Sequence, residues 1–351
     1  MRTLLFIGMA IPCVLARANE AQPDVKLYGV LDVGVEYINN AGDKGGAIIR
    51  MQSGGMSTSH VGLRGSEPLG GGMRAFMQLE NGFLADTGRA ADPRSLFNRQ
   101  ANVGIAWAGG SVLLGRSDST PGDFLSDDPF GNNYTWSGVS THLRGGRRDG
   151  TLGRVSNLVK YEGRFGAYRL GASYGFGEVA GKPAADAKYA SALDYRQAGW
   201  GWTLIYDREN SDVLFPGYSR AGNLGLSGSA LLGRSKVSAG YRRHLKHGIG
   251  RADLRSDFLW LGLALPLAGA NTLSFGFYHV DMRNVPDNGG ENPRLFAARL
   301  RHAMSARTDL YATAGYAWIG NGQPVGVGNN ARLYAENGAQ VGINLGMRHK
   351  F

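Results

Sequence analysis

The side chains best suited to chemistry are charged groups in and beside residues 117–153, the longest segment without a strand pattern. Four aspartates occupy its first third: Asp118, Asp123, Asp127 and Asp128. A Pro-Phe-Gly sequence follows them, made of Pro129, Phe130 and Gly131. A loop of 37 residues is usually functional or disordered. The cluster is therefore either a functional acidic site or a solvated acidic surface loop.

Basic residues alternate with apolar ones in the segments that flank this loop. Arg154 and Lys160 alternate with Val155, Val159 and Tyr161, and Arg64 shares the parity of Gly62. Successive side chains of a strand point to opposite faces, so these three cations lie opposite an apolar face. Arg116 is an exception, because strict alternation places it on the apolar side with Leu114.

The residue types needed for catalysis or metal binding do not form a recognisable pattern. His142, His244 and His279 fall in unrelated segments with no serine motif beside them. Cys13 is the only cysteine. We therefore expect neither an enzyme nor a metal site or cofactor.

The first residues predict export from the cytoplasm. Arg2 precedes an apolar stretch, 4–15, and Ala16-Arg17-Ala18 offers a cleavage site. This predicts a signal peptide over 1–18 and a mature chain over 19–351 that lacks cysteine. The net charge of +10 makes nucleic acid a conceivable partner. Export and the spread of the basic residues argue against it.

The rest of the chain alternates apolar and polar residues with a period of two. In 339–351, Val341, Ile343, Leu345, Met347 and Phe351 share one face, while glycine, Asn344, Arg348 and Lys350 share the other. Glycine contributes 55 of 351 residues, which disfavours helices. No run of 18 apolar residues follows residue 18. Alternation of this kind is typical of strands that face lipid on one side and water on the other.

Short glycine-rich turns and longer polar segments alternate along the chain. The seven short turns fall near residues 68–72, 108–110, 163–166, 197–199, 232–234, 266–269 and 304–306. The eight longer segments are 39–46, 86–94, 117–153, 178–185, 210–220, 247–251, 284–293 and 320–338. This arrangement predicts an all-β fold, a 16-stranded antiparallel transmembrane β-barrel. Its last strand must pair with Val25 to Ile38 to leave no free edge.

Several motifs together resemble the trimeric, 16-stranded general porins of Neisseria- and Bordetella-like bacteria. They are Val25 to Asp32, Leu63 to Ala75 followed by Gln78-Leu79-Glu80, Phe97 to Ala101, Leu114-Gly115-Arg116, Arg154 to Tyr161 and the terminal Phe351. The resemblance covers nearly all of the mature chain. It implies an outer-membrane porin through which small hydrophilic solutes and ions diffuse passively.

The resemblance also implies how the charged residues are used. The third loop, 117–153, folds into the barrel and narrows it, and its acids Asp123, Asp127 and Asp128 face cations on the wall. The expected wall cations are His60, Arg64, Arg116, Arg154 and Lys160. His60 stands where the family commonly has arginine, and the loop has Asp-Asp-Pro-Phe-Gly in place of Pro-Glu-Phe-Gly. A bulge at Gly115 could re-aim Arg116 into the pore.

The wall cations and a mature charge of about +8 predict a mild preference for anions. Arg144, Arg147 and Arg148 are either pore residues or solvated loop charges. A substrate-specific channel for sugars or carboxylates is the alternative, which Arg169, Arg242, Arg299 and Arg301 keep open. The family resemblance adds a homotrimer, outer-membrane lipid and lipopolysaccharide around it, and barrel-insertion machinery that reads Phe351.

Overall fold

The computed structural model describes residues 24–42, 44–125, 127–131, 135–138, 153–214, 217–247, 252–284, 292–319, 326–328, 335 and 338–351. Side chains of 211–219 and 319 are not described. The predicted signal peptide 1–18, Cys13, and the loop arginines Arg144, Arg147 and Arg148 lie outside the described residues.

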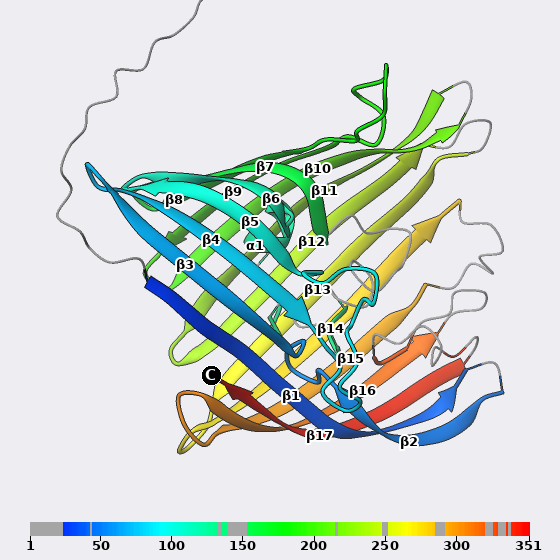
Figure 1. The fold of residues 1–351 in the computed structure, drawn as a ribbon. Helices are drawn as coiled ribbons and strands as arrows, with labels where there is room; N and C mark the ends of the chain where they lie inside the picture. Colours follow the sequence, from blue (N-terminus) through cyan, green and yellow to red (C-terminus); the bar gives the residue numbers. More distant parts are fainter. Residues whose placement is uncertain are drawn as a thin grey trace, which may run out of the picture.

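Nearly all of the described chain is strand (Figure 1). The strands are β1 (Asp24–Ala41), β2 (Gly46–Ser53), β3 (His60–Gly70), β4 (Met73–Gly82), β5 (Gln100–Trp107), β6 (Gly110–Asp118), β7 (Arg154–Phe165), β8 (Tyr168–Gly175), β9 (Lys188–Gln197), β10 (Trp200–Leu214), β11 (Gly217–Leu232), β12 (Ser235–His247), β13 (Leu254–Pro266), β14 (Asn271–Arg283), β15 (Arg294–Ala303), β16 (Thr308–Ile319) and β17 (Gly338–Lys350). One short helix, α1 (Thr120–Phe124), follows β6. Among the described residues, no helix is long and apolar enough to cross a membrane.

The strands close into an antiparallel barrel, because β17 pairs with β1 from Val30↔Lys350 to Ile38↔Gly342. β2 and β3 both pair with β1 and form one barrel strand that is interrupted at 54–59. The barrel therefore has 16 strands, as the sequence predicts. The predicted pairing of the last strand with Val25 to Ile38 is confirmed.

All seven predicted short turns join the expected strands, and they lie at one end of the barrel. One of the eight longer segments is wrong. Residues 210–220 were expected to form a long loop, but β10 runs to Leu214 and β11 starts at Gly217, with Leu214 paired to Gly217. The polar residues in this stretch extend two strands beyond the rest of the wall.

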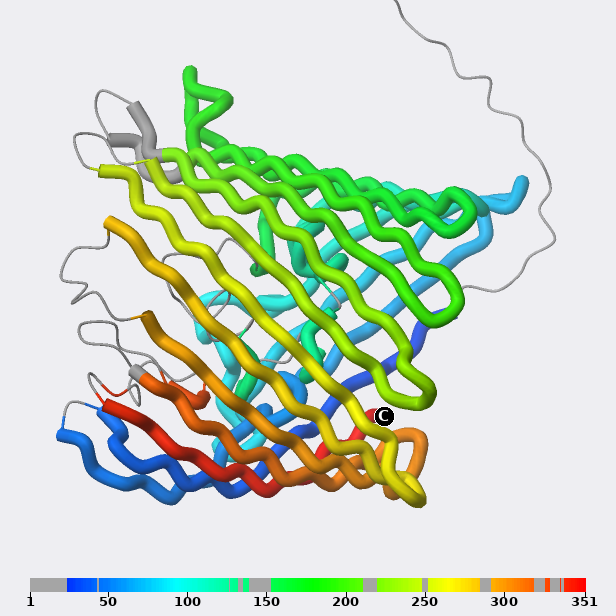
Figure 2. The backbone as a smooth tube through the Cα atoms, turned by 180° about the vertical axis from the view of Figure 1, so that it is seen from behind, coloured from blue at the N-terminus to red at the C-terminus, as the bar shows by residue number. Residues whose placement is uncertain are grey.

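The barrel is apolar outside and polar inside along most strands. On β11, Leu224 and Leu226 are each 54% exposed, whereas Asn223 and Ser227, which flank this pair, are buried, as is Gly225 between the two leucines. The same alternation recurs on β10 to β14, the strands that form the near wall in Figure 2. Buried backbone groups in a bilayer must bond within the protein, and closure of the barrel satisfies them. Exposed apolar side chains are stable there because lipid replaces water around them.

The break between β2 and β3 is held by a single buried carboxylate. Asp32 of β1 is fully buried and accepts hydrogen bonds from three successive backbone amides, Gly55, Met56 and Ser57, at 2.7 to 3.0 Å. The Tyr311 hydroxyl of β16 donates to the same carboxylate at 2.7 Å. The amides of residues 55–57 have no strand to pair with, and the Asp32 carboxylate accepts their hydrogen bonds instead.

Phe351 lies across the seam of the barrel. Its backbone amide donates to the Gly29 carbonyl at 3.1 Å, and the Gly29 amide donates to the Phe351 carbonyl at 3.0 Å. A Cβ added at Gly29 would overlap the Phe351 ring and lie 2.7 Å from the His60 carbonyl oxygen. Only glycine at position 29 lets the terminal ring lie this close to the first strand.

We expect Gly29→Val to weaken the seam, because the new side chain must displace both Phe351 and the backbone of β3. Overpacking of this kind costs about 1–3 kcal/mol. Urea unfolding of the refolded barrel, followed by tryptophan fluorescence, measures the change. Gly46→Val is the matched control, since a Cβ there meets no atom within 4 Å. Equal stability of both variants would contradict the seam contact.

Candidate functional site

The loop that follows β6 begins with a capped helical turn. The Ser119 hydroxyl accepts the Gly122 amide at 3.2 Å, and Pro121 occupies the first turn of α1. Serine caps and early prolines favour helix starts at such positions. The buried Phe124 ring lies under the Arg169 guanidinium of β8, 4.0 Å from its centroid. It also fills the space that Gly171 leaves open. The helix is therefore fixed to inward-facing residues of β8.

A second set of contacts joins the loop to the wall formed by β6 and β7. Lys160 donates to Asp123 of α1 at 2.6 Å and to the Ser117 hydroxyl at 2.8 Å. Arg154 lies 3.5 Å from the Asp118 carboxylate. Asp123 retains 29% side-chain exposure and Asp118 retains 22%, so these acids still face open space beside their partners.

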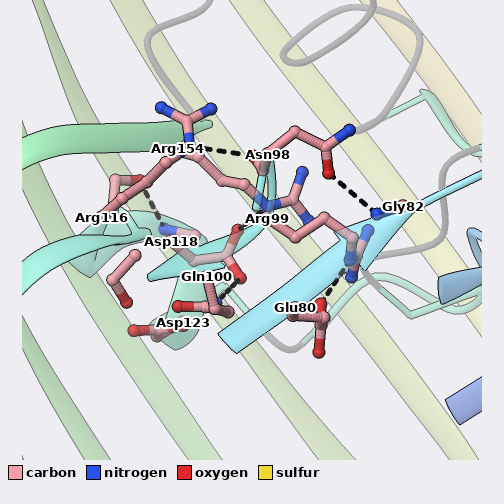
Figure 3. Close-up of polar contacts among 12 residues, drawn as sticks. Glu80, Gly82, Asn98, Arg99, Gln100, Arg116, Asp118, Asp123 and Arg154 are labelled. Atoms are coloured by element: carbon pink, nitrogen blue, oxygen red, sulfur yellow. Dashed lines mark hydrogen bonds and ion pairs between the residues drawn. The ribbon is translucent and has the colours of Figure 1, made fainter. Parts of the chain in front are cut away.

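Neighbouring strands add further charges to the same wall. Arg99, which precedes β5, pairs with Glu80 of β4, and His60 of β3 lies 3.7 Å from the other Glu80 oxygen. Glu80 also accepts the Tyr28 hydroxyl at 2.8 Å. Figure 3 shows Arg99, Arg116 and Arg154 approaching one another from different segments.

The side chain of Arg116 is re-aimed by an irregularity in the sheet. The register of β6 on β7 shifts between Gly115 and Ser117, and two residues of β7, Ser156 and Asn157, lie opposite Arg116. Gly115 has a φ of +127°, and Asn157 has a φ of +55°. Arg116 donates to the Asn98 carbonyl at 2.9 Å and to the Ser156 hydroxyl at 2.7 Å. A bulge therefore exists where the sequence suggested one.

The three arginines of this wall meet at a cavity of about 330 Å³ near the long-loop end of the barrel. Arg99, Arg116 and Arg154 line it together with Asp92 and Asn98. Three guanidinium groups at one cavity favour anions, and the low-dielectric wall strengthens their field. Glu80 and Asp118 limit the local excess of positive charge.

Asp127 holds the loop to the opposite wall. Its side chain is fully buried and accepts two hydrogen bonds from Arg196 of β9, at 2.8 and 3.0 Å. The Ser227 hydroxyl of β11 donates to it at 2.9 Å. Burial opposes ionisation, but the hydrogen bonds from Arg196 outweigh it, so the pKa of Asp127 lies below its usual value. The Asp127 carboxylate therefore serves to attach the loop to the wall.

Asp128 starts a tight turn through the Pro-Phe-Gly sequence. The Gly131 amide donates to the Asp128 carbonyl at 2.9 Å, and Gly131 has a φ of +71°. The Asp128 carboxylate accepts the Phe130 amide at 2.8 Å, Ser137 at 2.9 Å and Tyr278 of β14 at 3.1 Å. Burial raises its pKa to about 6, although these hydrogen bonds oppose the rise.

Aromatic packing completes the attachment of the loop. Phe130 is 4% exposed and lies under the Arg299 guanidinium of β15, 4.7 Å from the ring centroid. Trp136 is fully buried, and it lies where Cβ atoms on Gly315 and Gly342 would be. Inward-facing Trp260 and Tyr278 belong to the same apolar cluster. Phe130 and Trp136 therefore pack on β14 to β17, across the lumen from β6 and β7.

The structure brings together four of the five expected wall cations: His60, Arg116, Arg154 and Lys160. Arg64 lies elsewhere, over the Tyr28 ring at 4.1 Å, in a cavity of about 510 Å³ beside the short turns. Of the three expected loop acids, Asp123 meets a wall cation of this group, whereas Asp127 and Asp128 bond to β9, β11 and β14.

Two basic residues of the site were missed from the sequence. Arg99 lies immediately before β5, outside any strand, so alternation does not tell which way its side chain points. Its position inside the Phe97–Ala101 motif was the one indication of a role. Arg196 lies at the end of β9 beside a turn, where an arginine ordinarily faces solvent. Its role depends on Asp127, which is 69 residues away in sequence.

The barrel is closed, and its 16 strands present apolar side chains outward and charged side chains inward. These features define a pore-forming protein of the outer membrane. A profile of the Gram-negative porin family matches residues 8–320, and the chain belongs to that family. It is 27% identical to outer membrane porin protein 32 of Delftia acidovorans, over 95% of this chain and 96% of the relative. An outer membrane porin protein of Bordetella pertussis is 26% identical over the whole of both chains.

Solved structures agree on the fold. An anion-selective porin from Comamonas acidovorans superposes with a TM-score of 0.83 at 22% identity, covering 94% of this chain and all of the other. OmpF of Salmonella typhi superposes with a TM-score of 0.67 at 14% identity, covering 93% and 97%. The chain is thus a β-barrel of the bacterial outer membrane.

We expect the turn at Asp128 to be held more firmly in acid. A carboxyl whose folded pKa of about 6 exceeds the unfolded value of about 3.9 favours the folded loop most below pH 4. This contribution is lost as the pH rises through 6. Deuterium uptake by peptides covering 127–131, corrected for intrinsic exchange, should therefore be greater at pH 7 than at pH 5.

Asp128→Asn should remove this pH dependence, because the side chain is then neutral throughout. Asp127→Asn is the contrasting variant. Its lowered pKa keeps Asp127 ionised from pH 5 to 7, so loss of the Arg196 pair should raise uptake equally at both pH values. A wild-type pH effect that survives in Asp128→Asn would contradict the assignment.

Proposed function

We propose that this porin forms a water-filled channel for passive diffusion of small hydrophilic solutes and ions, with a mild preference for anions. The observation that carries the preference is the cavity lined by Arg99, Arg116 and Arg154. An anion passing this point meets three guanidinium groups, whereas a cation finds Asp118 and Asp123 already beside Arg154 and Lys160. The superposable Comamonas porin is described as anion-selective, which supports the proposal.

The loop 117–153 is proposed to act as the constriction. Its described residues contact β6 to β9 through α1 and β9 to β17 through Asp127 to Ser137. In this proposal His60, Arg99, Arg116, Arg154 and Lys160 are the wall cations, and Asp118 and Asp123 are the acids facing them. Asp127, Asp128, Pro129, Phe130 and Gly131 hold the loop in place. Arg64 acts nearer the short-turn mouth.

The substrate-specific alternative requires a row of accessible basic or aromatic residues along the lumen. Arg242 is fully buried and Arg299 is 3% exposed, so solutes would not reach either side chain. Arg169 is bound by Glu162 at 2.7 and 2.8 Å. Arg301 keeps 39% side-chain exposure but lies 3.6 Å from Asp309. These placements favour diffusion through a charged constriction.

The proposed assembly is a homotrimer in outer-membrane lipid and lipopolysaccharide. A superposable outer membrane protein of Vibrio cholerae, OmpT, is described in a trimer form. Large apolar side chains on the outer face of β2, Ile49 and Met51, are 74% and 57% exposed and suit contact with either lipid or another copy. We also propose that barrel-insertion machinery reads the terminal strand through Phe351, which is 42% exposed.

Planar bilayers containing the purified protein, under a tenfold KCl gradient, test the channel and its selectivity. We expect stable conductance steps and a reversal potential that favours chloride. The double variant Arg99→Gln/Arg154→Gln should lower the chloride-to-potassium permeability ratio by roughly twofold or more. Arg234→Gln/Arg307→Gln removes the same charge at exposed short turns and should leave the ratio unchanged.

Two outcomes would overturn the proposal. Absence of conductance in a folded wild-type barrel would exclude the channel. A wild-type reversal potential that favours potassium would exclude the anion preference while leaving the channel intact. Competition by a single sugar or carboxylate at micromolar concentration would favour the substrate-specific alternative.

A further inference from the structure

Arginines occur on the outer face of the barrel as well as in its lumen. Five of them lie on adjacent strands near the long-loop end, and we call them the outer arginine rim: Arg208, Arg220, Arg243, Arg255 and Arg283. They alternate with inward-facing neighbours that are buried. Arg242, His244 and Ser256 are each fully buried beside Arg243 and Arg255. The rim therefore points away from the channel. Its strands, β10 to β14, form the near wall in Figure 2.

Strand register places the rim in rows around the wall. One row runs Tyr206, Leu224, Arg243, Asp257 and Asp281. The next row toward the long loops runs Arg208, Gly222, Leu245, Arg255 and Arg283. A third row contains Arg220 and His247. On the side of the short turns, the outward face becomes apolar with Leu226, Leu259 and Leu261, which are 42–54% exposed.

The first of these rows and its neighbours enclose a hollow in the outer face. A cavity of about 260 Å³ is lined by Tyr206, Arg208, Arg220, Leu224, Arg243, Leu245 and His247. Gly222 lies at its centre, between Arg208 and Leu245, and contributes no side chain. The hollow thus has an apolar floor on one side and three guanidinium groups around it.

Acidic residues neutralise only part of the rim. Asp257 lies 3.0 Å from Arg243 and 2.5 Å from Arg255, and Asp281 lies 3.0 Å from Arg283. Asp253 pairs with His247 at 2.6 Å. Within the part of the chain that the structure describes, Arg208 has no acidic partner. On β10, Arg208 therefore adds positive charge to the hollow.

We propose that the outer arginine rim binds the phosphate-bearing headgroup of an anionic lipid in the outer leaflet, with the hollow between β10 and β12 as its site. Guanidinium groups bind phosphate oxygens in a bidentate manner, and basic pockets at the edge of a bilayer bind lipid headgroups. An outward arginine is far less costly at the interface, where this rim lies, than at the middle of the bilayer. The inference goes beyond conduction and does not depend on it.

A lipid fits this surface better than free phosphate does. The guanidinium groups and the apolar residues below them share one outward face, so a headgroup at Arg208 places its acyl chains over Leu224, Leu226 and Leu259. Tyr206 lies at the boundary, 44% exposed, where amphipathic rings are common. Free phosphate would use the charges but not the apolar surface.

Binding of lipid A bisphosphate to the purified protein in detergent tests the proposal, measured by native mass spectrometry. Arg208→Gln/Arg243→Gln should weaken binding by roughly tenfold or more. Arg208→Gln alone breaks no described contact and should weaken it several-fold. Arg234→Gln/Arg307→Gln, at the other end of the barrel, should bind as wild type does. Single-channel conductance of every variant verifies folding independently of lipid binding.

Two probes separate the sources of phosphate. Lipid A stripped of both phosphates should bind wild type about as weakly as the bisphosphate binds the double variant. Inorganic phosphate at 10 mM, a concentration roughly a thousandfold above that of the protein, should not displace the lipid. Displacement would assign the rim to aqueous anions, and unchanged binding in the double variant would exclude the rim as a lipid site; either result overturns the proposal.

Discussion

Every other feature of this barrel depends on the hydrogen bonding of its first strand to its last. A bilayer offers no water to a free strand edge, so the sheet must return to its own beginning. The pairing of β1 with β17 from Val30↔Lys350 to Ile38↔Gly342 does this. Gly29 and Phe351 extend it to the final residue of the chain. The register fixes which side chains face inward.

The interior uses its charged residues for two different purposes. Asp127, Asp128, Arg196 and Arg299 are held by one another or by aromatic rings, and together they attach the loop to β9 through β15. On the opposite wall, arginines surround an open cavity. Buried ion pairs hold shape, because breaking one leaves an uncompensated charge. The arginines around the cavity are partly exposed, so ions in water can reach them.

The sequence was sufficient for the architecture because strand alternation and turn chemistry are local signals. Strand number, short turns and closure follow from them. The error at 210–220 has the same origin, since polar residues that extend a strand above the membrane look like a loop. The site was harder to predict. Arg99 lies outside a strand, and the partners that Asp127 and Asp128 have on the barrel strands are 69 or more residues away, so alternation could not assign them.

Placement of each residue of the site therefore needed a different kind of information. The family resemblance named His60, Arg154 and Lys160 together as wall cations, and a local glycine indicated the bulge that re-aims Arg116. Neither signal could show that Asp127 and Asp128 attach the loop to the wall. Their partners on β9, β11 and β14 reach the loop only in the folded barrel.

The contacts of the buried Asp32 carboxylate bear on the order of assembly. Its carboxylate holds residues 55–57 and also accepts Tyr311 of β16, while Thr135 of the loop donates to the Gly54 and Gly55 carbonyls. Trp136 packs where β16 and β17 lack side chains. The surface that the loop contacts is thus incomplete until the last strands have paired. A barrel without β16 and β17 therefore lacks part of the contact surface that holds Thr135 and Trp136.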